Sequence, residues 1–186
     1  MSSREHILEK IRVLKLDQKP IPTIPDFGIN EDLQERFRAS ISSNKGEMIT
    51  AEALIFKIES GLFPNVFSTV SDFADFTNQP LPEDSHAFAN LDLAILRGQF
   101  GVAENGAIWL EDADLKLRVI PFITEHLVVV LDKNELVPTM HQAYDRIGNA
   151  ASGFGLFIAG PSKTADIEQS LVIGAQGAKS LMVVLI

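Results

Sequence analysis

The chain has 186 residues, 46% of them hydrophobic, a formal net charge of -9 and no cysteine. This size and composition predict one domain with a substantial buried core, and the acidity argues against a nucleic-acid partner. Without cysteine, disulfides, thiol catalysis, thiolate-bound zinc and a cysteine-ligated iron–sulfur cluster are excluded in this chain.

Residues 1–25 predict an N-terminal helical arm. Residues 3–15 carry Ile7, Ile11 and Leu14 at helical spacing, and the proline-rich connector that follows, residues 19–25, cannot be helical. We expect the domain itself to cover residues 26–186. The arm is either a mobile segment or a clasp that holds an oligomer together, or it packs on its own domain. No signal peptide or membrane-spanning run is evident, so we expect a cytoplasmic protein.

Three further helices are predicted from apolar residues at helical spacing. The first begins at an Asn30 N-cap and ends by Gly46. The second covers residues 51–60, and the third begins at Pro138 and ends at Gly148. The residues expected to be buried on them are Leu33, Phe37, Ile41, Leu54, Ile55, Ile58, Met140, Ala143, Tyr144 and Ile147.

Short runs rich in Val, Ile, Leu and Phe predict the strands. Several are continuously apolar, which is typical of strands covered on both faces, and we expect the last one to be central or well covered. Strands interleaved with helices predict an α/β fold whose sheet is largely parallel, with antiparallel hairpin segments in residues 91–131. The predicted strands are residues 66–70, 91–96, 107–110, 117–123, 127–131, 154–159 and 181–186.

Residues 160–168, Gly-Pro-Ser-Lys-Thr-Ala-Asp-Ile-Glu, predict a strand-to-helix turn. Ser162 or Thr164 would cap the helix, and Lys163 would lie beside the free N–H groups of its first turn, where an anion could bind. The alternative is a well-capped turn whose carboxylates complement the helix dipole. We expect Asp166 to brace the loop through hydrogen bonds, so that Ser162, Lys163 and Thr164 face a pocket.

A second candidate is the hairpin turn at Glu104, Asn105 and Gly106, since Asn-Gly favours such turns. Glu104 is either an exposed residue at a strand end or a nucleophile or base. His126 interrupts an apolar run, where a histidine is more often a core residue with one hydrogen bond than a ligand. No histidine spacing predicts a metal site.

These segments resemble the LutC/YkgG lactate-utilisation proteins, the LUD domain family. The most specific piece is residues 160–168, followed by Gly174, Gly177 and an apolar last strand. Residues 103–107 and 121–130 agree in order and spacing, so the resemblance covers the chain from about residue 45 to its end. Two departures are Asn105-Gly106-Ala107 in place of Thr-Gly-Thr and Gln176-Gly177-Ala178 in place of His-Gly-Pro.

The resemblance implies a Rossmann-like fold of the NagB/RpiA/CoA-transferase-like group, a mostly parallel sheet with helices on both faces. It also implies a role in oxidising L-lactate to pyruvate with iron–sulfur partner proteins. Because the chain lacks cysteine, the clusters would lie in the partners, and this chain would be a non-redox subunit that binds a small carboxylate or phosphate between the two candidate turns. The ligand-binding residues so implied are Asn105, Gly106, Gly160, Ser162, Lys163, Thr164, Asp166, Gly174 and Gly177.

Two alternatives stay open. Glu104-Asn105-Gly106 is similar to the Glu-Asn-Gly turn of CoA transferases, whose glutamate attacks an acyl-CoA, which would make this chain a small acyl- or phosphate-group enzyme that uses Glu104. Otherwise the chain is a purely structural interaction module that makes its contacts through the N-terminal arm, and a homo-oligomer is one form that it could take.

Overall fold

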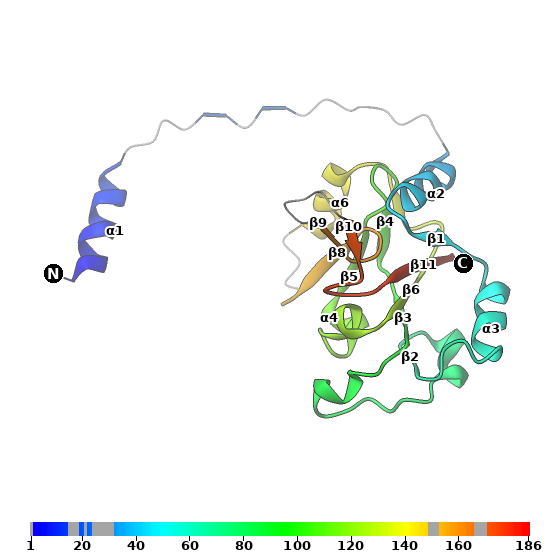
Figure 1. The fold of residues 1–186 in the computed structure, drawn as a ribbon. Helices are drawn as coiled ribbons and strands as arrows, with labels where there is room; N and C mark the ends of the chain where they lie inside the picture. The colour runs from blue at the N-terminus through cyan, green and yellow to red at the C-terminus, as the bar shows by residue number, and fades with distance from the viewer. Residues whose placement is uncertain (1, 15–18, 21, 24–31, 149–152, 166–170) are drawn as a thin grey trace.

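Most of the described residues form an α/β body, and helix α1 (Ser3–Val13) stands apart from it (Figure 1). Within the described part, no helix has both the length and the apolar character that crossing a bilayer requires. The residues described in this computed structural model are 2–14, 19–20, 22–23, 32–148, 153–165 and 171–186.

A parallel sheet of five strands forms the centre of the described residues, in the order β1-β11-β6-β3-β2. The last strand of the chain is paired on both sides, by β1 and β6, which confirms that it is central. The three middle strands begin level with one another, because His126 pairs with both Leu93 and Ser180. The strands are β1 (Glu47–Met48), β2 (Val66–Ser68), β3 (Leu93–Arg97), β6 (His126–Leu131) and β11 (Ser180–Leu185).

Both faces of this sheet are covered, as the continuously apolar strands predicted. On one face, Ile95 packs in a cluster with Leu54 of α3 (Ala51–Glu59) and Phe73 of η1 (Ser71–Phe76). On the other face, Leu96 packs with Phe37 of α2 (Leu33–Ser43). Neighbouring residues of a strand point to opposite faces, so a strand buried on both sides needs apolar residues at every position.

A second sheet, which the sequence did not predict, packs on the α2 side, in the order β7-β4-β5-β8 within the described residues. It comes from two excursions of the chain, one between β3 and β6 and one between β6 and β11. Its β4-β5 and β5-β8 pairs are antiparallel, which confirms the expected hairpin. The outer face is covered by α6 (Met140–Ile147). Its strands are β4 (Phe100–Val102), β5 (Ile108–Glu111), β7 (Leu136–Val137) and β8 (Gly155–Ile158).

The strand predicted over residues 117–123 is wrong. Its second half forms the short helix α5 (Ile120–Ile123), with Pro121 in the first turn, and another short helix, α4 (Asp112–Leu115), lies just before the region. Proline has no N–H to give to a strand ladder, whereas the first turn of a helix needs none. The apolar run is explained by the burial of Ile120 and Pro121 rather than by sheet pairing.

Two smaller expectations about helices also change. Helix α2 begins after Asp32, whose side chain accepts a hydrogen bond from the Gln34 amide, and Asn30 lies outside the described residues. On α6, Ala143 is buried as predicted, but Tyr144 is 63% exposed. Tyr144 lies at the margin of the buried stripe, where its ring packs edge-to-face with the ring of Phe157.

Helix α1 forms as predicted but buries none of its residues. Its N-terminus carries a capping box between Ser2 and Glu5, which satisfies two backbone N–H groups. Ile7 and Ile11 are 57% and 58% exposed, so among the described residues the arm does not pack on its own domain.

We expect Leu54→Ala to lower the free energy of unfolding by about 2–5 kcal/mol, because this side chain is fully buried between α3 and the sheet. Leu81→Ala is the control, because it makes the same change at a side chain that is 50% exposed. We expect that loss to stay below about 1 kcal/mol. Urea denaturation followed by circular dichroism measures both, and equal losses would contradict the packing described here.

Candidate functional site

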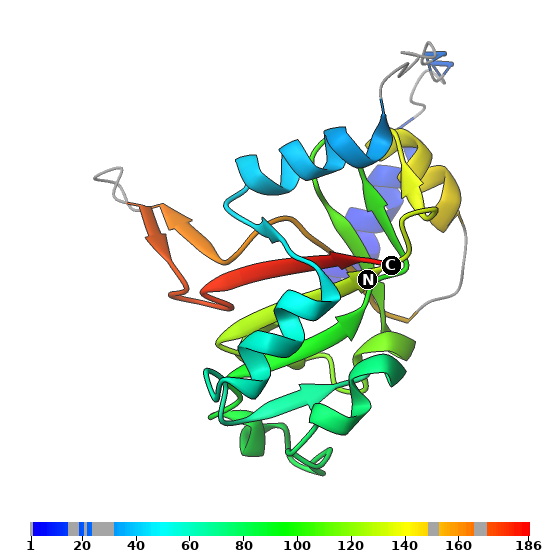
Figure 2. The same cartoon turned by 90° about the vertical axis from the view of Figure 1, so that its right-hand side faces the viewer.

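The segment after Gly160 forms a β-hairpin, so the helix predicted there is wrong. Strand β9 (Lys163–Ala165) pairs antiparallel with β10 (Leu171–Ile173), and the hairpin projects from the body (Figure 2). The Gly174 amide donates to the Ser162 carbonyl at 2.9 Å and closes its base. The β-branched Thr164, Val172 and Ile173 favour paired strands over a helix. The expected bracing role of Asp166 falls outside the described residues.

This hairpin changes what the segment can offer an anion. No helix begins there among the described residues, so the N–H groups of a first turn are missing. The Ser162 amide donates to the Ala178 carbonyl at 2.9 Å. The Lys163 ammonium donates to the Asn44 carbonyl at 3.1 Å. Both donors therefore already have protein acceptors.

Asn44, the residue that ends helix α2, joins the two candidate turns. Its side-chain amide donates to the Asn105 carbonyl at 2.6 Å, while its own carbonyl accepts from Lys163. One turn of helix earlier, the Ser40 hydroxyl donates to the Ala103 carbonyl at 2.8 Å. Asn44 is not among the residues predicted for the site, although a polar residue just before Lys45-Gly46 is a signal for the end of a helix.

Two glycines let these turns approach α2 closely. Gly160 has a φ of +82°, and a Cβ there would lie 2.3 Å from the Asn44 carbonyl oxygen. Gly106 has a φ of +69°, and a Cβ there would lie 3.0 Å from the Ile41 backbone nitrogen. The end of α2 thus lies between the two turns, where the sequence led us to expect a shared ligand pocket.

Glu104 lies at the start of α6. Its backbone N–H donates to the Pro138 carbonyl at 3.0 Å, and its carboxylate accepts from the Met140 amide at 2.9 Å. Met140 is the first residue of α6, where free N–H groups and the helix dipole favour a negative charge. This contact gives the carboxylate a capping role and weakens the case for an acyl-transfer nucleophile.

A cavity of about 230 Å³ lies on the other side of the Gly160 loop. Leu127 and Leu181, at the beginnings of β6 and β11, line it from the central sheet, and Leu156 lines it from the second sheet. The lining is mostly apolar, and the polar side chains in it are the Ser162 hydroxyl and the Gln176 amide. The full lining is Pro121, Phe122, Leu127, Leu156, Phe157, Ile158, Ala159, Gly160, Pro161, Ser162, Gln176, Gly177, Ala178 and Leu181.

A second, more polar cavity of about 540 Å³ shares Phe122, Gln176 and Gly177 with the first. Its charged residues are Asp92, Glu125 and Lys179. Lys179 pairs with Glu125, and their hydrogen bond together with the lysine charge lowers the pKa of the Glu125 carboxyl below its usual value. The ammonium is therefore already neutralised.

The Asp92 carboxylate in this second cavity accepts hydrogen bonds from the Asn65 backbone and side chain, each at 2.8 Å. Both carboxylates of the cavity therefore have protein partners, and Asp92 ties the loop before β3 to the loop before β2.

The structure brings together only part of the predicted site. Gly160, Ser162 and Gly177 line the first cavity, and Gly174 and Gly177 line the second. The other candidates lie elsewhere. Glu104 caps α6, and Asn105 and Gly106 pack against the C-terminal end of α2. Lys163 and Thr164 belong to strand β9.

His126 is a half-buried residue whose Nδ1 lies 2.7 Å from the Ser180 hydroxyl, which confirms the expected single hydrogen bond. Among the described residues, no group of three or more metal-binding side chains comes together. The chain also has no cysteine for an iron–sulfur cluster. The donor set of this chain therefore does not suit such a cluster.

We expect Gly160→Ala to lower the free energy of unfolding by more than Gly61→Ala. Both glycines have a left-handed φ, so each alanine adds strain of about 1–2 kcal/mol. Only at Gly160 would the new Cβ also displace backbone, because nothing lies within 4 Å of Gly61. Thermal and urea denaturation of the two variants measure the difference, and equal effects would mean that the loop is not seated on Asn44.

Comparison with known proteins agrees with this fold. The crystal structure of a DUF162 family protein from Deinococcus radiodurans superposes with a TM-score of 0.59 at 18% identity, covering 82% of this chain and 95% of that one. This likeness shows the shared fold.

Sequence comparison identifies the family. Lactate utilization protein C of Halalkalibacterium halodurans is 35% identical over 92 residues, which are 46% of this chain and 40% of that protein. The protein of the same name in Exiguobacterium sp. is 30% identical over 125 residues, 63% of this chain and 54% of that protein. The matches thus span about half the length of these relatives. The profile of the LUD domain matches residues 29–186, so the chain belongs to the LUD domain family.

Proposed function

We propose that this chain is a non-redox subunit of an L-lactate utilisation system, working in the cytoplasm beside iron–sulfur partner proteins. Support comes from the LUD domain match and from the relatives called lactate utilization protein C. The observation that carries the proposal is the apolar cavity bordered by the family's two glycine loops, in a chain without cysteine.

The cavity suits a small carboxylate of the size of lactate or pyruvate. The methyl group of either acid would lie against Leu127 and Leu181, where burial of apolar surface is favourable. The carboxylate would accept hydrogen bonds from the Ser162 hydroxyl and the Gln176 amide. Since Lys163 and Lys179 already have partners, recognition would rest on these neutral donors.

This chain would position the substrate rather than move electrons. Oxidising lactate to pyruvate removes two electrons and two protons, and the electrons must pass to an acceptor. With no cysteine, the chain offers no thiolate to hold a cluster. The proposal therefore assigns electron transfer to the partners and substrate binding to the cavity.

Titration of the isotope-labelled chain with L-lactate and with pyruvate, followed by NMR, tests the ligand. We expect shifts at Ser162 and Gly177, and binding weakened about fivefold in Ser162→Ala and in Gln176→Ala because each loses one hydrogen bond. Ser42→Ala, exposed on α2, is the control and should bind like the native chain. Equal affinity in all four proteins would contradict this placement of the ligand.

Reconstitution tests the role in the system. The chain should elute together with the iron–sulfur partner proteins, and lactate oxidation should fall when it is omitted. Separate elution together with unchanged oxidation would refute the role.

A further inference from the structure

Helix α1 presents an apolar stripe that nothing covers among the described residues. Ile7, Ile11 and Leu14 follow one another at helical spacing and are 57%, 58% and 65% exposed. Isolated helices shorter than about 12–15 residues are marginal in water. An eleven-residue helix with an apolar stripe is therefore expected to gain its stability from a surface that it docks on.

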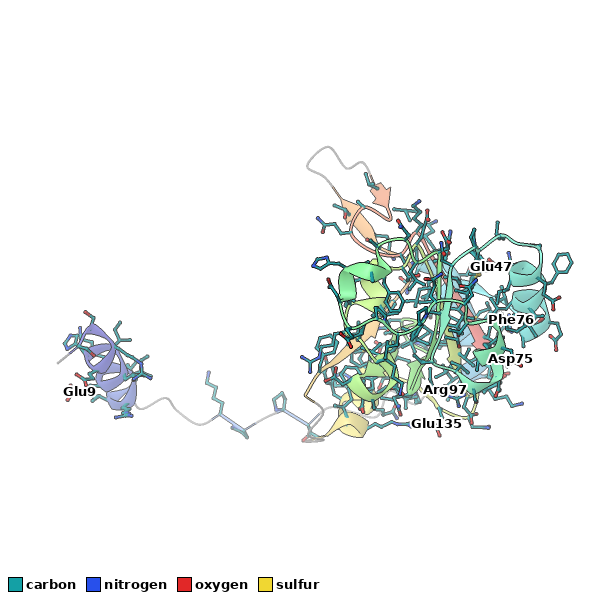
Figure 3. The ribbon with its side chains drawn as sticks, turned by 90° about the horizontal axis from the view of Figure 1, so that it is seen from below. Glu9, Glu47, Asp75, Phe76, Arg97 and Glu135 are labelled. Carbon is teal, nitrogen blue, oxygen red and sulfur yellow. The ribbon has the colours of Figure 1, made fainter. Side chains whose placement is uncertain are left out.

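The charges nearest to this stripe of α1 are basic. Arg4 lies three residues before Ile7 and Lys10 three residues after it, so the two cations flank the stripe. Glu5 and Glu9 are offset by two residues and lie on the opposite side of the helix. Figure 3 shows α1, with Glu9 labelled, well apart from the body. The arm thus offers an apolar centre with a basic rim.

The α3 face of the body has the complementary character. Phe56 of α3 is 73% exposed, and Leu62, just beyond the helix, is 59% exposed. Glu52 and Glu59 lie one turn before and one turn after Phe56, on its side of the helix. Exposed large apolar residues with a charged rim mark interaction surfaces.

The surroundings of this face are acidic over a long stretch of the chain. Residues 49–92 carry a single cation, the half-buried Lys57. Segment η1, which covers the same face of the sheet as α3, adds Asp75 beside Phe76 (Figure 3). The acidic residues of this stretch are Glu52, Glu59, Asp72, Asp75, Glu83, Asp84 and Asp92.

We propose that α1 of one copy docks across α3 of a second copy, with Ile7 and Ile11 against Phe56 and with Arg4 and Lys10 beside Glu52 and Glu59. Charge complementarity points to this face, because Glu52 and Glu59 lie beside the exposed Phe56 and can face the two cations of the arm.

The separation of α1 from the body favours a second copy over the arm's own domain, because none of the residues of α1 is buried there. A proline-rich segment acts as an extended, semi-rigid spacer, and residues 19–25 contain three prolines, Pro20, Pro22 and Pro25. A helix of this length is only about 16 Å long. One such helix alone buries less surface area than the roughly 800 Å² per partner typical of a stable interface. We therefore infer that the docking is reciprocal, so that each copy places its α1 on the α3 face of the other.

Sedimentation velocity on the full chain tests the docking. We expect the native protein to dimerise, and Ile11→Glu and Phe56→Glu each to weaken the dimer at least about tenfold because each places a carboxylate in the apolar contact. Raising NaCl from about 0.1 M to 1 M should also weaken it. The controls are Val13→Glu, off the stripe on the same helix, and Val172→Glu on the hairpin, both of which should dimerise like the native chain.

Mixing the two defective variants makes the test specific. Phe56→Glu keeps an intact arm and Ile11→Glu keeps an intact face, so an equimolar mixture should form more dimer than either variant alone. A native chain that stays monomeric at a protein concentration of about 100 μM would overturn the proposal. So would a Phe56→Glu variant that still dimerises while Ile11→Glu does not, since the arm would then dock elsewhere. Circular dichroism checks that each variant is folded.

Discussion

The seating of two turns on the C-terminal end of α2 is the constraint on which the rest of this fold depends. The last carbonyls of a helix have no partner within it, and here Lys163 supplies one for Asn44. The Asn44 side chain in turn holds the Asn105 carbonyl. One residue therefore ties a loop that follows the second sheet to a turn within that sheet. Both approaches are close enough that a Cβ at Gly160 or Gly106 would meet backbone.

The same seating places the wall of the cavity. Helix α2 is fixed on the central sheet by Phe37, which is fully buried. The Gly160 loop, held against the end of that helix, then faces Leu127 and Leu181, where β6 and β11 begin. Because these two strands start in register, their first apolar residues lie side by side as one surface. The cavity is thus a product of how the two sheets and α2 meet.

Charge is distributed differently in the site and on the surface. Around the cavities the ionic groups are paired, as in Lys179 with Glu125, so the apolar lining meets neutral donors. Away from the site, Arg4 and Lys10 of α1 and Glu52 and Glu59 beside Phe56 take part in none of the ion pairs of the described residues. A ligand and a second copy of the chain would therefore be recognised by different physical means.

The sequence by itself determined the α/β class, the buried parallel strands, helices α1, α2, α3 and α6, and membership of the LUD domain family. These follow from periodicity, apolar runs and local motifs, which act over a few residues. Only the tertiary structure decided the second sheet, the β9-β10 hairpin, the capping role of Glu104 and the place of Asn44. Each depends on a partner far away in the chain: Asn44 meets residues 61 and 119 positions later, and Glu104 meets one 36 positions later. No local pattern specifies contacts of that range, because they exist only once the helices and sheets have packed.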